Sequence, residues 1–382
     1  MISRATELRL KKLAGSFRGV AVIGPRQSGK TTLCRKAFPT KPYVSLENPD
    51  VADFAKTDPR GFFAQFKEGA ILDEVQRVPH LFSYLQQILD ETKKRGLYIL
   101  TGSNNFLLQE NITQTLAGRI AYQQLLPLSL SELRTAKKLK PDFSWHIITG
   151  GYPEVISKKL NPMDWYPSYY QTYVERDVRQ IKSIINLMDF TKFIRLCAGR
   201  TGQLLNLSSL ANDCGIDQKT ATSWLGVLQS SFIIYLLRPY FNNFNKRLVK
   251  SPKLYFYDTG LASSLLGISN PDQIALHAAK GALFENLVVT ELLKDRMNKG
   301  LLDNLYFWRD KTGNEVDVLI DDDGKMTALE LKAGETISSD YFKGLEYFKV
   351  QVPSSAGKVI YGGKQSQKRS NGIEVIPWNE FF

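Results

Sequence analysis

The sequence contains few of the residues on which disulfide frameworks and zinc centres depend. Its 382 residues include only three histidines and three cysteines, Cys34, Cys197 and Cys214. The cysteines are far apart and odd in number, so we expect buried free thiols in a reducing compartment. No apolar run reaches the ~18 residues that a membrane-spanning helix needs. The charged segment 1–15 also lacks the apolar core of a signal peptide. These absences predict a cytoplasmic protein without a membrane partner.

Negative charge is also in short supply. The chain has 38 Asp and Glu against 50 Lys and Arg, which gives a formal net charge of +12. Such an excess is typical of proteins that meet nucleic acid, although composition alone is a weak indicator. The length predicts two to four domains, and the hydrophobic fraction of 43% is ordinary for globular domains.

The clearest motif is a glycine-rich loop between an apolar segment, 20–23, and a helix-compatible segment, 32–37. The predicted ATP-binding residues of this loop are Gly24, Pro25, Arg26, Gln27, Ser28, Gly29, Lys30, Thr31 and Thr32. They fit the pattern G-x-x-x-x-G-K-[ST], in which backbone N–H groups and a helix N-terminus bind phosphates. Lys30 is expected to reach the β- and γ-phosphates, and the Thr31 hydroxyl to bind Mg²⁺.

Two acids follow the next buried segment. Apolar residues 70–72 lead into Asp73 and Glu74, as at a strand that ends in a site. We expect Asp73 to hold Mg²⁺ through water beside Thr31, and Glu74 to orient and polarise the attacking water. Together with the glycine-rich loop, the pair predicts hydrolysis of ATP.

Three further residues are candidates for contacts with ATP. The β-prone segment 97–100 is followed by Thr101-Gly102-Ser103-Asn104, where Ser103 or Asn104 would contact the γ-phosphate or the water, or else cap a turn. Arg119 would stabilise charge on the transferring phosphate, in its own subunit or a neighbour's. The alternative for Arg119 is a surface ion pair.

The middle of the chain contains a possible helix-turn-helix. Segment 207–217 predicts a short helix and a glycine-containing turn, and Asp217 would cap a second helix over 218–230. Two β-prone segments, 232–237 and 254–257, flank a basic stretch, so the region resembles a winged helix. The predicted nucleic-acid contacts are Lys246, Arg247, Lys250 and Lys253. Such cations would bind phosphates rather than read bases; packing between domains is the alternative interpretation.

The C-terminal third carries a second chemical pattern. A predicted helix, 280–294, bears Glu285, and a predicted hairpin places Asp317 and Glu330 on its two strands, with Lys332 on the same face as Glu330. Converging carboxylates repel each other, and Mg²⁺ would resolve the conflict and activate a water for phosphodiester attack. Asp317 and Glu330 would be the ligands, Glu285 an outer ligand, and Lys332 would stabilise the transition state.

Taken together, the motifs resemble known families. GPRQSGKTTL, AILDEVQ, YILTGSN, LAGR and PLSLSEL, with GGYPEV, YYQTYVERDVRQI and YFYDTGL, resemble a branch of the AAA+ ATPases over nearly the whole chain. The resemblance implies a parallel sheet flanked by helices, ATP as nucleotide, and ring-like or dimeric association. The C-terminal acids and Glu-x-Lys resemble the PD-(D/E)xK nuclease superfamily, although Val316 stands where that motif has proline.

The sequence therefore predicts an α/β protein of four parts. These are an AAA+ core at 1–135, a helical connector at 136–200, a winged-helix-like segment at 201–260 and a restriction-endonuclease-like domain at 261–382. The predicted function is ATP hydrolysis coupled to action on DNA, with Mg²⁺ as a cofactor and a nuclease-like site. The alternative is an ATP-dependent switch or remodeller that binds DNA or protein and whose nuclease-like domain is silent.

Overall fold

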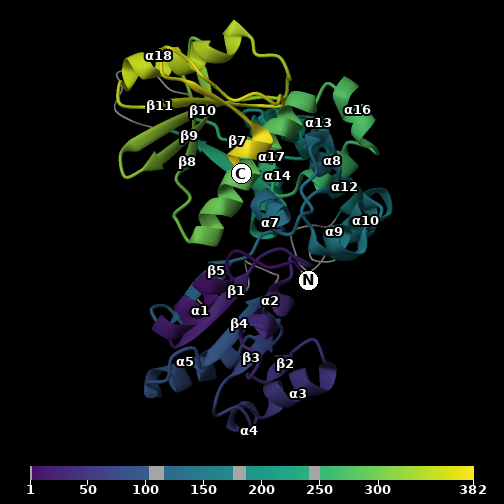
Figure 1. The fold of residues 1–382 in the computed structure, drawn as a ribbon. Coiled ribbons are helices and arrows are strands. Elements are labelled where there is room, and N and C mark those ends of the chain that lie inside the picture. Colours follow the sequence, from purple (N-terminus) through teal and green to yellow (C-terminus); the bar gives the residue numbers. More distant parts are fainter. Residues whose placement is uncertain (1, 103–115, 175–185, 241–249) are drawn as a thin grey trace.

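The protein is described from a computed structural model that covers residues 2–102, 116–174, 186–240 and 250–382. Two lobes follow one another along the chain, and the connection between them lies close to the N-terminus in the view of Figure 1. Each lobe is built on one sheet, of five strands in the N-terminal lobe and eight in the C-terminal lobe.

The N-terminal lobe is a parallel α/β layer, as the sequence predicts. Its strands are β1 (Gly19–Ile23), β2 (Tyr43–Ser45), β3 (Ala70–Asp73), β4 (Tyr98–Gly102) and β5 (Ile120–Gln124), in the order β2-β3-β4-β1-β5. All neighbours run parallel. Every residue of β1, β3 and β4 is buried, as expected for strands covered on both faces. The carboxyl ends of these three strands share one edge, which is where the site lies.

Helices surround this sheet. They are α1 (Glu7–Ser16), α2 (Lys30–Ala37), α3 (Pro49–Thr57), α4 (Pro59–Ala64), the 3₁₀ turn η1 (Val75–Arg77) and α5 (Leu81–Glu91). Both α3 and α4 begin with a proline after an Asn or Asp whose side chain accepts a backbone N–H. This is the combination that favours a helix start.

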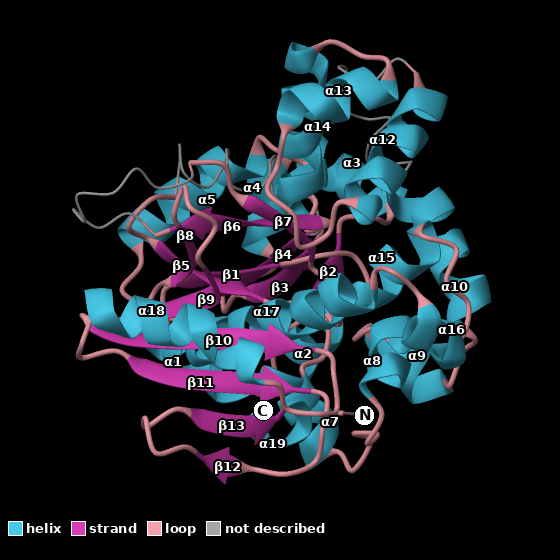
Figure 2. Cartoon of the chain, turned by 90° about the horizontal axis from the view of Figure 1, so that it is seen from above, coloured by secondary structure: helices cyan, strands magenta, loops and turns pink. Residues whose placement is uncertain are grey.

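The connection to the C-terminal lobe is helical. It contains α7 (Leu130–Thr135), α8 (Phe143–Thr149), α9 (Pro153–Lys158), α10 (Pro162–Tyr169), η2 (Tyr170–Val174), α12 (Leu187–Gly199), α13 (Leu207–Cys214), α14 (Gln218–Ser230), α15 (Thr259–Leu265) and α16 (Pro271–Leu276). The predicted helix pair is present as α13 and α14. Gly215 between them has φ 83°, and Asp217 accepts the N–H of Thr220. In Figure 2 these two helices lie at the opposite end of the view from β12 and β13.

The C-terminal lobe contains the second sheet, in the order β12-β13-β11-β10-β9-β8-β6-β7. Its strands are β6 (Ile234–Pro239), β7 (Lys253–Phe256), β8 (Leu305–Arg309), β9 (Glu315–Asp322), β10 (Lys325–Lys332), β11 (Ala356–Tyr361), β12 (Gln367–Lys368) and β13 (Glu374–Pro377). Its helices are α17 (Lys280–Lys299), η3 (Ser339–Phe342), α18 (Lys343–Gln351) and α19 (Trp378–Phe381). The predicted hairpin is the antiparallel pair β9 and β10, and β11 is parallel to β10.

The would-be wing strands belong to this sheet. Strand β6 pairs antiparallel with β7 and parallel with β8, with Arg238 opposite Tyr306. The boundary predicted at residue 260 therefore does not separate two sheets. Backbone hydrogen bonds join β6, before that boundary, to β8, after it.

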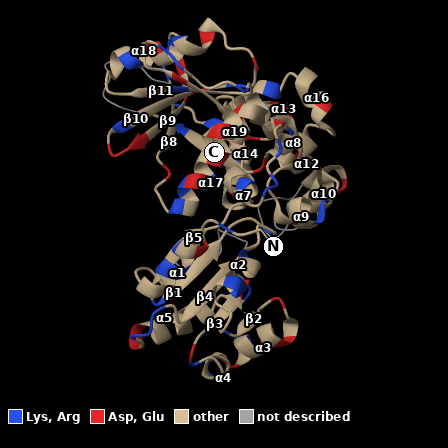
Figure 3. Cartoon of the chain, in the orientation of Figure 1, with Lys and Arg blue, Asp and Glu red and all other residues tan. Residues whose placement is uncertain are grey.

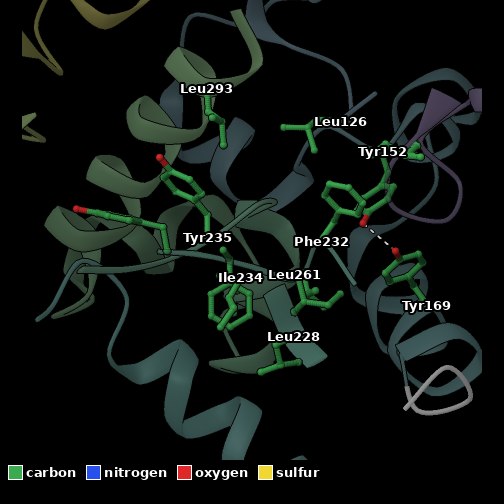
Figure 4. Close-up of a cluster of buried hydrophobic side chains, with 14 of the residues drawn as sticks. Leu126, Tyr152, Tyr169, Leu228, Phe232, Ile234, Tyr235, Leu261 and Leu293 are labelled. Carbon is green, nitrogen blue, oxygen red and sulfur yellow. Dashed lines mark hydrogen bonds between the residues drawn. The ribbon is translucent and has the colours of Figure 1, made fainter. Parts of the chain in front are cut away.

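One large cluster of buried apolar residues extends through both lobes, beside two smaller clusters. Figure 4 shows Leu126 from the end of the first lobe near Tyr152 of the helical connection, whose hydroxyl is bonded to Tyr169, and Phe232 near Leu261. All belong to one buried cluster, which also includes Leu293 of α17. Among the residues described, no helix is both long and apolar enough to cross a membrane.

Candidate nucleotide and acidic sites

The glycine-rich loop connects β1 to α2, as predicted. Gly24 is required there, because a Cβ at this position would stand 2.1 Å from the Leu125 carbonyl oxygen. Gly29 has φ 93° and precedes the first residue of α2, a backbone conformation that glycine adopts without strain. The buried Lys30 Nζ donates to the Gly24 and Pro25 carbonyls at 3.0 and 2.8 Å. Burial lowers the pKa of Lys30, while Glu74 and Asp73 act in the opposite direction.

Hydroxyl groups from three elements converge on Asp73 at the end of β3. Thr31 Oγ1 donates to both carboxylate oxygens at 3.1 Å, and the Tyr43 hydroxyl donates to Oδ2 at 2.6 Å. Thr101 Oγ1, at the tip of β4, donates to Oδ1. Burial and Asp73 raise the pKa of Tyr43 to about 12. The carboxylate is thus held beside Thr31, which is the arrangement needed for a shared Mg²⁺.

Thr101 is a residue that the sequence reasoning missed. The predicted candidates at this strand tip, Ser103 and Asn104, lie outside the described residues. The position of Thr101 in its strand could have identified it. Thr101 pairs with Val22 of β1, one residue before the end of that strand. A polar side chain there reaches the edge at which β1 and β3 end.

Glu74 adopts an unusual backbone conformation. Its φ of 54° and ψ of 43° lie in the left-handed region, which is uncommon for residues other than glycine and costs of order 1 kcal/mol. Its N–H donates to Thr101 Oγ1 at 3.4 Å, and Gln76 Nε2 donates to its carboxylate at 2.5 Å. This conformation turns the chain at the end of β3. The Glu74 side chain then lines the same cavity as Lys30 and Asp73.

The cavity over the loop has a volume of about 630 Å³, is open to solvent on one side and is bordered by other parts of the chain. Arg4 of the N-terminal segment donates to the Ser28 carbonyl at 2.7 Å and the Leu126 carbonyl at 2.6 Å, and pairs with Glu132 at 3.0 Å. Tyr173 of η2 accepts a hydrogen bond from Gln27 Nε2 at 2.9 Å. The N-terminus and the helical connection therefore both touch the loop.

Arg119 lies away from this cavity. It precedes Ile120, which pairs with Gly19 at the amino end of β1, roughly 13 Å along the strand from the loop. Its guanidinium donates to the Asp90 carboxylate at 2.6 and 2.8 Å. Of the predicted alternatives, a phosphate contact in the same subunit does not fit this position, whereas a surface ion pair does.

The C-terminal acids meet at the ends of β9, β10 and α17. Asp317 Oδ2 accepts the Leu331 N–H at 2.8 Å. The ammonium of Lys332 is 2.6 Å from Glu330 and 3.9 Å from Asp317. Glu285 reaches the same region, where the Tyr255 hydroxyl donates to it at 2.5 Å. The hairpin thus brings Asp317, Glu330 and Lys332 together, as predicted.

Lys253 contradicts its prediction as a nucleic-acid contact. Its side chain is only 4% exposed, because it points inward from β7 and pairs with Glu285 at 2.9 Å, Glu315 at 2.5 Å and Asp317 at 3.8 Å. Burial alone would lower the pKa of Lys253, but these three carboxylates together raise it above its ordinary value. A cation held in this way cannot contact a DNA phosphate.

The other predicted cations give mixed evidence. Lys250 is exposed, and Lys246 and Arg247 lie outside the described residues. Helices α13 and α14 carry one basic residue, Lys219. Figure 3 shows basic and acidic residues interspersed over both lobes.

The acidic site fits a divalent cation only in part. Glu330 is buried, and its Oε2 has no hydrogen-bond partner among the described residues. Burial and Asp317 raise the pKa of Glu330 to about 8. Carboxylates suit Mg²⁺, and an unpaired buried oxygen is the kind of group that a cation satisfies. Yet no three His, Cys, Asp or Glu side chains in the described ranges are arranged to hold a metal ion. Lys253 stands between Glu285 and Asp317 instead.

Asp258, in the YFYDTGL motif, joins two sequence motifs. It is 4% exposed and accepts the Gly151 N–H at 2.8 Å and the Tyr166 hydroxyl at 2.6 Å. Gly151 belongs to GGYPEV, and its carbonyl accepts the Leu128 N–H at 2.7 Å. These motif residues therefore have a structural role at the junction of the lobes.

Helix α17 continues this junction. Glu291 accepts the Leu130 N–H at 2.6 Å, and Lys294 donates to the Leu128 carbonyl at 3.1 Å. The two side chains pair at 2.6 Å with exposures of 2% and 5%. Burial raises the pKa of Glu291, which Lys294 opposes. The segment that follows β5 is thereby fixed to the helix that carries Glu285.

These features define a nucleotide-binding domain of the P-loop class. Residues 16–134 match the family described as AAA domain, so this part of the chain is an AAA-family ATPase domain. Residues 280–381 match the domain of unknown function DUF4143, and residues 140–272 match DUF8612. The chain therefore combines an AAA-family domain with a C-terminal DUF4143 domain.

Similar proteins occur in bacteria and archaea. The uncharacterized protein Rv2008c of Mycobacterium tuberculosis is 27% identical over 384 residues, covering 99% of this chain and 84% of that protein. The uncharacterized protein MJ1637 of Methanocaldococcus jannaschii is 24% identical, covering 95% and 84%. Among solved structures, the Walker-type ATPase PABY2304 of Pyrococcus abyssi is 14% identical with a TM-score of 0.47, covering 69% of this chain and 96% of that one.

Proposed function

We propose that the protein hydrolyses ATP and acts on DNA, with a metal-dependent nuclease-like site in its C-terminal part. The observation that carries the first half is the convergence of Thr31, Tyr43 and Thr101 on Asp73 beside the buried Lys30. An acid at the surface without a binding role would not need hydrogen bonds from three hydroxyl groups that belong to three different elements. A shared cavity bounded by Lys30, Asp73 and Glu74 is what a Mg²⁺–triphosphate would need.

The residue roles follow from this geometry. Lys30 would turn from the loop carbonyls to the β- and γ-phosphates, while loop N–H groups and the start of α2 bind the phosphate oxygens. Thr31 and Asp73 would hold Mg²⁺, which offsets charge on the phosphates. Glu74 would orient and polarise the attacking water. Thr101 would fix the orientation of Asp73 and of the Glu74 backbone.

The test is ATP turnover by three variants. Lys30→Ala should lose both nucleotide binding and turnover, whereas Glu74→Gln should bind ATP and turn it over at least about a hundredfold more slowly. Lys94→Ala, at an exposed pair with Glu68, is the matched control and should behave as wild type. Unimpaired turnover by Glu74→Gln would remove the role assigned to that residue.

The second half of the proposal is supported by the order of elements around the acids. Helix α17, strands β8, β9 and β10, helix α18 and strand β11 follow one another, with β9 and β10 antiparallel and β10 and β11 parallel. This order is compatible with the PD-(D/E)xK resemblance. Asp317 and Glu330 would bind Mg²⁺, Glu285 would be an outer group, and Lys332 would stabilise charge on the phosphodiester.

Cleavage assays decide between this activity and a silent site. Duplex, single-stranded and branched DNA should be incubated with Mg²⁺ or Mn²⁺, with and without ATP. Cleavage that is lost in Asp317→Ala and kept in Asp323→Ala, an exposed acid on the turn of the same hairpin, would support the enzyme. Cleavage by Asp317→Ala at the wild-type rate would exclude this site.

A second candidate is an ATP-dependent switch or remodeller with no nuclease activity. The inward position of Lys253 among the acids favours it, since an ammonium there supplies the positive charge that a metal would bring. The switch predicts binding without cleavage on every DNA form. DNA binding that weakens steeply with salt would indicate phosphate contacts, whereas binding of a protein partner alone would favour a remodeller.

A further inference from the structure

The acids of the C-terminal site enclose a lysine that comes from a different part of the chain. Lys253 belongs to β7, Glu285 to α17, and Asp317 to β9. A buried ammonium is costly unless it is paired, and here three carboxylates lie within 4 Å of one nitrogen. The ammonium therefore fills the point at which the carboxylates converge.

The cluster is close to neutral as it stands. Its members are the acids Glu285, Glu315, Asp317 and Glu330 and the cations Lys253, Arg309 and Lys332. With every acid counted as ionised, four carboxylates and three cations leave a formal charge of −1. A divalent ion that bound here with every cation in place would bring the sum to +1, so the ion gains little attraction unless one cation leaves.

Of these three cations, Lys253 is placed to be the competitor. Arg309 is bonded to Glu315 at 3.2 Å and is 38% exposed, and Lys332 is 33% exposed. Lys253 is the deeply buried one, and it approaches Asp317 Oδ1, the oxygen opposite the one that accepts the Leu331 N–H. A metal ion bound through Oδ1 of Asp317 would lie close to this ammonium.

We propose that Lys253 is an internal cation that competes with a divalent metal ion for Asp317, so that the metal binds tightly only when the ammonium leaves. This inference rests on the metal role proposed above for Asp317 and Glu330. In this proposal the structure shows the acidic site with the Lys253 ammonium in the place that a metal ion would take.

The backbone around Lys253 is joined to a second segment of the chain. The Leu205 N–H donates to the Pro252 carbonyl at 2.8 Å, and the Gly202 N–H donates to the Leu254 carbonyl at 2.7 Å. The segment that leads into α13 is therefore bonded to the residues on both sides of Lys253. A shift of this segment would therefore move Lys253 relative to the acids.

Binding of Mn²⁺ to the full-length protein without nucleotide tests the proposal. Lys253→Met keeps the length of the side chain and removes its charge. We expect it to bind Mn²⁺ at least about tenfold more tightly than wild type in calorimetric titration, because the competing charge is gone. Lys250→Met is the matched control, an exposed lysine three residues earlier, and should bind as wild type does. The gain should vanish in the double variant Lys253→Met/Asp317→Asn.

The outcomes separate the inference from the function on which it rests. Mn²⁺ binding that depends on Asp317 but is no tighter in Lys253→Met would overturn the competition and leave the metal role standing. If Asp317→Asn changes Mn²⁺ binding in neither background, the metal role itself falls.

Loss of the lysine also leaves acids unpaired, so a second variant guards against misfolding. Lys253→Met/Glu315→Gln removes one negative charge with the positive one, at an acid that has no proposed metal role. Its thermal midpoint should rise with Mn²⁺ more than that of wild type, since the ion binds the folded state. An equal rise would again contradict the competition.

Discussion

The buried pair at the junction of the lobes gives a prediction whose size follows from the structure. Replacing Lys294 by Met leaves the Glu291 carboxylate, 2% exposed, without its counter-ion and leaves the Leu128 carbonyl without its donor. Removing one partner of a buried ion pair costs roughly 3–5 kcal/mol. At roughly 2–4 °C for each kcal/mol in a unit of 150–250 residues, the thermal midpoint should fall by about 10 °C.

The second replacement should reverse most of that loss. In Lys294→Met/Glu291→Gln the charge is gone, and the Gln oxygen still accepts the Leu130 N–H. The midpoint should recover by more than half, as a double-mutant cycle reports for coupled neighbours. Lys299→Met is the control, because it breaks an exposed pair with Asp295 on the same helix, worth about 0–1 kcal/mol.

Circular dichroism melts at pH 7.5 without nucleotide provide the measurement. A Lys294→Met protein that melts within about 2 °C of wild type would refute the reasoning. So would a double variant that is less stable than Lys294→Met alone.

Three further outcomes are expected. Thr101→Val should lower ATP turnover at least about tenfold with nucleotide affinity nearly unchanged, because it removes a hydrogen bond to the Asp73 carboxylate, a type worth about 1.5–3 kcal/mol; unchanged turnover would contradict it. Arg119→Ala should leave the turnover of dilute protein within about twofold of wild type, since the guanidinium is bound to Asp90; a large loss would place Arg119 in catalysis. Burial lowers the pKa of His146 to about 4, so the unfolded state takes up a proton that the native state refuses, and stability falls as pH drops from about 6.5 to 4, by up to about 3 kcal/mol. His146→Gln should flatten that slope in acid-unfolding curves.

Local patterns were enough to predict the arrangement of the glycine-rich loop and of Asp73. The strand, loop and helix around Lys30 lie within about twenty residues, so the sequence specifies their geometry directly. Asp73 was identifiable because an acid after a buried strand must lie at the carboxyl edge of a parallel sheet. The segment 97–100 correctly predicts the next strand, but the polar residues expected to act at its tip were Ser103 and Asn104, whereas Thr101 within the strand contacts Asp73.

Long-range contacts were beyond the sequence reasoning. Lys253 was assigned to a DNA-binding wing because other cations surround it in the sequence. Its partners Glu285 and Asp317 lie 32 and 64 positions away, and nothing local indicates that β7 joins the C-terminal sheet. Asp258 is similar: its role depends on Gly151 and Tyr166, which chain position alone does not bring together. Both residues are buried, and contacts with residues distant along the chain, rather than local charge, decide what they do.

Helix α17 has a mechanical consequence. Glu285 and Lys294 are nine residues apart on it, which is a rise of about 14 Å, and most of the residues between them are buried. The first turns of the helix therefore contact the acidic cluster, and its middle is hydrogen-bonded through Glu291 and Lys294 to the segment that follows β5. A tilt of α17 at Glu291 and Lys294 would displace Glu285, so a movement of the segment that follows β5 would reach the acidic cluster through this one helix.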